Sequence, residues 1–130
     1  MMRSICILIS ASVIAMTVAS CGLKADKNDP LYVEVVAIHD EVMPKMSTMH
    51  KLKKKLRKVD GAETTDVIKL IAQLDAADEG MMQWMADFSP PEDKTARKTY
   101  LEGQLISVTK MANDINTAIA DAEGYLSSQQ

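Results

Sequence analysis

Imidazole and thioether side chains recur at helical spacing in one segment of the sequence. They follow one another at intervals of four, three and four positions, as His39, Met43, Met46 and His50. At about 100° per residue, these side chains fall within about 60° of one another on a helix. The sequence therefore predicts a stripe of possible metal-binding groups along one helix face.

A second group of sulfur and aromatic side chains lies farther along the chain. It consists of Met81, Met82, Trp84 and Met85. If the turn between the two segments centres near residue 62, an antiparallel hairpin places His39 level with Met85 and Met43 level with Met81. We therefore expect the two groups to meet at one level of the fold.

Together the two groups fit a soft-metal site. Thioether sulfur and imidazole nitrogen are suited to soft or borderline ions, above all Cu(I). The candidate ligands are His39, Met43, Met46, Met81, Met82 and Met85. Core packing is the commoner role of such residues, because methionine fills irregular gaps and makes favourable contacts with tryptophan. A groove for a partner helix around Met82 and Trp84 is the third interpretation.

The sequence offers few groups for catalysis. The chain has two histidines, and the residues of the acidic pairs Asp40-Glu41 and Asp78-Glu79 are adjacent in sequence. Adjacent residues point to different faces of a helix, so neither pair forms a facing acid and base. No enzymatic activity is predicted.

The charge balance argues against nucleic-acid binding. The chain has 15 Lys and Arg residues and 18 Asp and Glu residues. Loss of a leader that contains Arg3 leaves 14 basic against 18 acidic residues, a net charge of about −4, whereas nucleic-acid binding calls for a basic excess.

A run of basic residues lies at 51–58. Positive side chains near the C-terminal end of a helix interact favourably with the helix dipole, and contact with anionic lipid is the alternative role of this run. We expect acidic side chains of the last helix to neutralise this run, namely Asp114, Asp121 and Glu123.

Three amphipathic helices must position these groups. Apolar residues recur every three or four positions over 30–59, 65–88 and 91–127, and no strand pattern interrupts them. Asp29-Pro30 marks the first start, Pro44 predicts a kink, and Gly61 fits a helix end. Short connections favour antiparallel neighbours, so we expect an all-α, up-down-up three-helix bundle over residues 30–130.

The first part of the chain has the features of an export signal. Arg3 precedes an apolar run over residues 5–18, which is shorter than the roughly 20 residues that span a bilayer. The run ends in Val18-Ala19-Ser20-Cys21, which resembles the lipobox of bacterial lipoproteins. The sequence thus predicts a signal peptide over 1–20, a covalent lipid such as palmitate on Cys21, and a tether over 21–29.

Two segments of the helical part carry a further resemblance. They are His39 to Met46 and Ala77 to Met85, followed by Phe88. The segments resemble small helical lipoproteins of Bacteroidota, some of which carry the automatic label "viral A-type inclusion protein". The likeness covers most of residues 31–126. It implies a helical fold and a Gram-negative envelope location, and it implies no activity.

These features predict a membrane-anchored envelope lipoprotein with a non-enzymatic helical interaction domain. Its partner would be another protein or a second copy of the chain. A periplasmic or surface copper-binding lipoprotein is the alternative, and a structural spacer is a third. Because Gly22 follows Cys21 in place of an aspartate, the outer membrane is the favoured location.

The anchor is tested by Cys21→Ala. Several acyl chains hold a protein stably where one gives only marginal binding, so this variant should lose palmitate labelling and leave the membrane fraction. Cys6→Ala, inside the predicted leader, is the control and should stay membrane-bound. Retention of the Cys21→Ala protein in membranes would contradict the anchor.

Overall fold

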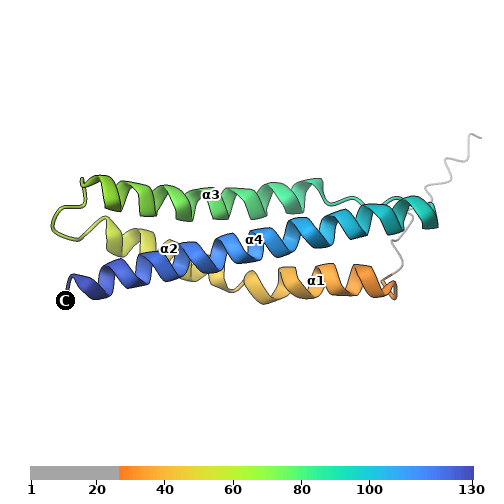
Figure 1. Cartoon of the computed structure of the whole chain (residues 1–130), viewed down its shortest axis with the longest axis horizontal. Coiled ribbons are helices and arrows are strands. Elements are labelled where there is room, and N and C mark those ends of the chain that lie inside the picture. Colours follow the sequence, from red (N-terminus) through yellow and green to blue (C-terminus); the bar gives the residue numbers. More distant parts are fainter. Residues whose placement is uncertain (1–26) are drawn as a thin grey trace, which may run out of the picture.

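The regular structure of this chain is entirely helical where it is described. The computed structural model describes residues 27–130, so the predicted signal peptide and Cys21 lie outside the described residues. Four helices follow one another: α1 (Pro30–Val42), α2 (Lys45–Leu56), α3 (Thr65–Asp87) and α4 (Lys94–Ser128). α1 and α2 follow one another end to end, and this line of two helices, α3 and α4 lie lengthwise beside one another (Figure 1). The predicted all-α class is confirmed.

Asp29 fixes the start of α1, as the sequence predicts. Its carboxylate accepts a hydrogen bond from the backbone N–H of Leu31 at 3.0 Å, and Pro30 occupies the first helical position. The other carboxylate oxygen lies 3.7 Å from Nε of Arg97 in α4. Asp29 therefore both caps α1 and joins its first turn to α4.

The last helix begins later than the sequence predicts. Residue 91 is the expected start, but α4 begins at Lys94. Asp93 caps it, because its side chain accepts a hydrogen bond from the backbone N–H of Ala96 at 2.8 Å. The carboxylate cap decides the boundary here, and the two preceding prolines remain in the connection.

Pro44 divides the first predicted helix. The sequence predicts one kinked helix over 30–59, whereas α1 ends at Val42 and α2 runs only to Leu56. Met43 and Pro44 keep helical backbone angles, with φ of −54° and −61°. The chain therefore continues in one direction through the break, which arises because proline lacks an N–H and crowds the preceding turn. We refer to α1 and α2 together as the first limb.

The turn after the first limb depends on one glycine. Gly61 has a φ of +84°, in the left-handed region that residues with a Cβ avoid. Its carbonyl oxygen accepts a hydrogen bond from the N–H of Thr64 at 2.8 Å, and α3 starts at the next residue. This tight turn sets α3 against the first limb.

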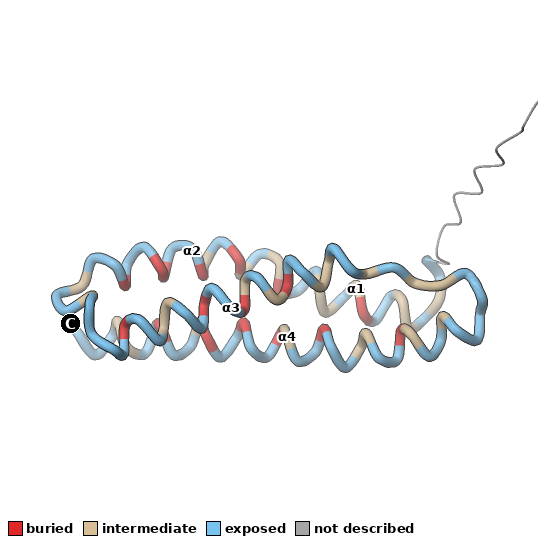
Figure 2. Tube along the Cα trace, turned by 90° about the horizontal axis from the view of Figure 1, so that it is seen from above, coloured by how far each residue is buried: buried red, intermediate tan, exposed pale blue. Residues whose placement is uncertain are grey.

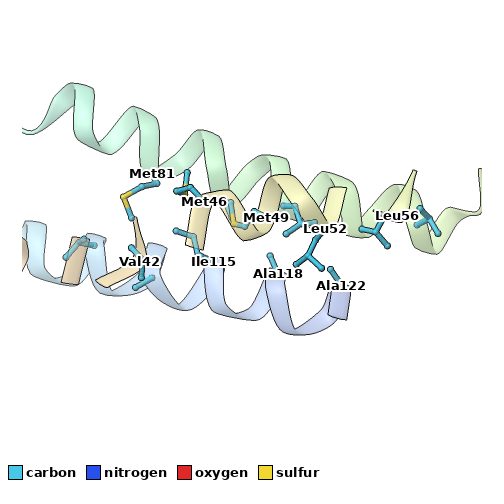
Figure 3. Packing of buried hydrophobic residues seen from close by; sticks show 14 of the residues in the cluster. Val42, Met46, Met49, Leu52, Leu56, Met81, Ile115, Ala118 and Ala122 are labelled. Atoms are coloured by element: carbon cyan, nitrogen blue, oxygen red, sulfur yellow. The ribbon is translucent and has the colours of Figure 1, made fainter. Parts of the chain in front are cut away.

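The core is a single line of apolar side chains between the helices. Buried positions of each helix face inward along its length (Figure 2). Met46 and Met49 of α2, Met81 of α3 and Ile115 of α4 meet in the middle of the molecule (Figure 3). Toward the end of α4, Ala118 and Ala122 replace larger residues and are buried. The second half of α4 is therefore packed against the other helices.

None of the helices described in residues 27–130 combines the length and hydropathy that a membrane span requires.

Leu74→Ala tests the assignment of the core face. Leu74 is fully buried in α3, so its truncation should lower the free energy of unfolding by about 2–5 kcal/mol. Ile68→Ala, on the exposed side of the same helix, is the matched control and should change it by less than about 0.5 kcal/mol. Urea denaturation followed by circular dichroism measures both. Equal losses in the two variants would show that the stripe has been assigned to the wrong face.

Candidate functional site

The candidate site lies where the first limb faces α3. Polar side-chain contacts join the two. Nε2 of His39 lies 3.0 Å from Sδ of Met85, Nε2 of His50 lies 3.8 Å from Oδ2 of Asp78, and Nζ of Lys53 lies 2.7 Å from Oδ1 of Asp75. Position numbers rise along the limb while they fall along α3. We call this line of contacts the seam.

The seam follows the stripe that the sequence predicts. His39 and His50 belong to that stripe and both contact α3. The contact between His39 and Met85 matches the predicted register. On α3, the facing stripe has spacings of three, four and three, and it consists of Asp75, Asp78, Met82 and Met85.

Two of the six candidate metal ligands belong to the core. Met81 is 0% exposed and Met46 is 9% exposed, and both lie in the hydrophobic cluster (Figure 3). The side chain of Met81 therefore points into the core and away from the surface of the seam. Its neighbour Met82 is 54% exposed and lies on the α3 stripe instead. Met43 is half-buried and packs against the core.

His39 has a defined orientation. Its Nδ1 lies 2.9 Å from Oδ1 of Asp40, on the opposite side of the ring from Met85. The imidazole centroid lies 5.7 Å from the ring of Trp84. The imidazole is therefore held by a carboxylate on one edge, a thioether on the other and an indole beside it.

Aromatic rings fill the space between α1 and α3. Trp84 and Phe88 have ring centroids 4.9 Å apart, and Phe88 lies 6.0 Å from both Tyr32 and Tyr100. Nε1 of Trp84 donates a hydrogen bond to Oε1 of Gln104 in α4 at 2.6 Å. Its ring packs against Phe88 and its N–H is hydrogen-bonded, so Trp84 is held in place and forms the floor of this space. Of Met82 and Trp84, around which the sequence predicts a groove for a partner helix, Met82 is the exposed residue.

A hollow remains open to solvent above these rings. Its volume is about 250 Å³. The residues that line it come from α1, α3 and the residue after α3, and they are Tyr32, Val36, His39, Asp40, Trp84, Met85 and Phe88. The hollow is mostly apolar, and the imidazole of His39 and the carboxylate of Asp40 are among its few polar groups.

The other half of the seam is ionic. Lys53 is only 8% exposed, and its ammonium group lies 3.5 Å from Asp78 in addition to its contact with Asp75. The expected neutralisation of the basic run by α4 is therefore wrong for its buried member, which α3 neutralises. Of the expected partners, Asp114 pairs with Lys110 at 2.6 Å. Lys53 could have been found from the sequence, because it extends the His-Met stripe by three residues.

Within residues 27–130, no group of three or more His, Cys, Asp or Glu side chains is arranged to hold a metal ion. A metal hypothesis for this part of the chain rests on methionine sulfur together with His39. Comparison with family models, with curated proteins and with solved structures gives no match for this chain. The resemblance to small helical lipoproteins stays a prediction.

Gln104→Leu tests whether the hollow has a fixed floor. The substitution removes the acceptor of the part-buried Trp84 N–H, and an unsatisfied buried donor costs about 1–3 kcal/mol. The free energy of unfolding should fall by that amount, and the emission of Trp84, the single tryptophan of the chain, should change. Gln73→Leu removes an exposed contact of 3.4 Å to Asp121 and should alter neither quantity. A silent Gln104→Leu variant would mean that Trp84 is not held in place.

Proposed function

We propose that this chain is a lipid-anchored lipoprotein of the cell envelope that binds a partner protein and catalyses no reaction. In this proposal a signal peptide over 1–20 is removed, Cys21 carries the lipid, and the first limb, α3 and α4 form an up-down-up bundle. The observation that carries the binding role is the aromatic hollow between α1 and α3. An open apolar hollow with a few polar groups is typical of a binding site.

The size of the hollow favours a protein side chain as its occupant. Small-molecule sites occupy about 300–1,000 Å³, and this hollow has about 250 Å³. Protein interfaces commonly insert one apolar or aromatic anchor into such a space. Asp40 lies at its rim with an exposed carboxylate. The proposed occupant is therefore a partner segment with an apolar anchor beside a lysine or arginine.

The position of the hollow agrees with a membrane-anchored role. Tyr32 lies two residues after the start of α1, at the end of the bundle where residues 27–29 lead into it (Figure 1). A tether over residues 21–29 would reach at most about 25–30 Å. The partner would thus bind at the end of the bundle that is nearest the membrane.

Site-specific photo-cross-linking in intact cells tests the proposal. A photoreactive residue at Val36, which lines the hollow, should give a product with one partner of defined mass. The same residue at Ile106 is the control, because Ile106 is 74% exposed and lies on α4, outside the hollow. Adding Asp40→Lys to the Val36 probe should reduce the product at least fivefold by charge repulsion.

Three results would overturn the partner proposal. Equal cross-linking from Val36 and Ile106 would show that the hollow has no special role. A product with twice the mass of the chain would assign the hollow to a second copy. Absence of any product at Val36 would leave the domain as a spacer.

A further inference from the structure

The contacts of His39 leave an electrostatic conflict in the neutral ring. Its Nδ1 lies 2.9 Å from a carboxylate oxygen of Asp40. An ionised carboxylate only accepts hydrogen bonds, so Nδ1 must carry the hydrogen. In neutral imidazole, Nε2 is then an acceptor, and it lies 3.0 Å from the thioether sulfur of Met85, which is also an acceptor. Two lone pairs thus face each other unless a positive species lies between them.

The surroundings of this pair favour a positive species. The Asp40 carboxylate lies on the other edge of the ring, and the Trp84 ring lies 5.7 Å from the imidazole. An indole face attracts cations within about 6 Å. A proton on Nε2 is one species that satisfies the pair. A metal ion that accepts one nitrogen and one sulfur ligand is the other.

We propose that Nε2 of His39 and Sδ of Met85 bind a soft monovalent metal ion, with Cu(I) as the natural example. Imidazole with thioether selects soft ions, whereas Mg²⁺ and Ca²⁺ prefer oxygen ligands. Bonds of about 2.0 Å to nitrogen and 2.3 Å to sulfur, as in zinc sites, place the two donor atoms about 3.5 Å apart at a tetrahedral angle. The sulfur of Met85 must therefore move by about 0.5 Å, which the flexible methionine side chain allows.

Met82 is the third ligand in this proposal. It lies three residues before Met85, one turn away on the stripe that faces the first limb. The two acidic residues that precede it on that stripe contact the limb directly. Met82 is 54% exposed, so its thioether can turn toward the ion without emptying a core position. Met46 and Met81 are buried in the core and take no part.

Asp40 acts as a positioning residue. Metal-binding histidines commonly donate their second ring N–H to a carboxylate, which fixes the tautomer and leaves the other nitrogen free to bind the metal. The contact between Asp40 and Nδ1 gives His39 this arrangement without any rearrangement of the ring. The inference stands independently of the proposed partner, although the ion lies beside the same hollow.

Competition for Cu(I) tests the site directly. The full chain, extracted in a non-ionic detergent, is titrated anaerobically with Cu(I) in the presence of a chromophoric Cu(I) chelator. We expect one equivalent of Cu(I) to bind, and the fluorescence emission of Trp84 should fall in proportion to the Cu(I) bound. Met85→Leu should weaken binding at least tenfold, and Met82→Leu should weaken it severalfold, because leucine keeps the volume and removes the sulfur. Met49→Leu, in the core two to three turns along the limb, is the matched control and should bind like the unchanged protein.

A thermal melt of each variant shows whether its fold is intact, and the ion should raise the melting temperature of the proteins that bind it. Absence of competition at several equivalents would overturn the metal site. Equal binding by Met85→Leu, or equal affinity for Zn(II), would also overturn the soft-metal site. Unchanged binding by Met82→Leu would remove the third ligand. The cross-linking at Val36 is carried out without added metal, so either proposal can fail alone.

Discussion

The register between the first limb and α3 is the constraint on which the candidate site depends. One helical turn advances about 5.4 Å, so a slip of one turn would carry Met85 out of reach of His39. Gly61 allows the tight turn that starts this register. The buried ammonium of Lys53 lies between Asp75 and Asp78 and then fixes the register, because a slip that moved it away from both carboxylates would leave its buried charge unpaired.

The two halves of the first limb differ in what they pack against. α2 contacts both α3 and α4, whereas the main helix partner of α1 is α4. Pro44 separates these halves, so the axes of α1 and α2 need not lie on one straight line. Between α1 and α3 the space is occupied by large rings, above all Trp84 and Phe88, instead of interlocking aliphatic residues. The hollow is a consequence of this change in packing along the limb.

Part of this arrangement could be predicted from the sequence and part could not. The helical segments could be predicted from the spacing of apolar residues and from the helix start at Asp29-Pro30. The pairing of His39 with Met85 could be predicted from a turn near residue 62. Each of these predictions depends on local geometry. For Met46 and Met81, the sequence was compatible with core packing and with metal binding, because their spacing fits the apolar stripe as well as the stripe of possible ligands. Met81 and its neighbour Met82 lie about 100° apart around the helix axis, and the packing of α3 against α4 and the first limb sets which of the two faces the core. The start of the last helix was predicted at residue 91 because proline is typical of a first helical position, whereas the helix is capped by Asp93 and begins at Lys94.

The seam places rigid and adaptable contacts at opposite ends. Hydrogen-bonded charges such as Lys53 and Asp75 have strict distance requirements, so that end of the seam holds the helices in one alignment. Thioether and aromatic contacts tolerate small changes of distance and angle. The end that contains His39 and Met85 can therefore rearrange around an occupant while the alignment is kept elsewhere. In this small bundle the contacts that fix the alignment of the helices are therefore separate from the candidate site, which contains His39 in the last turn of α1.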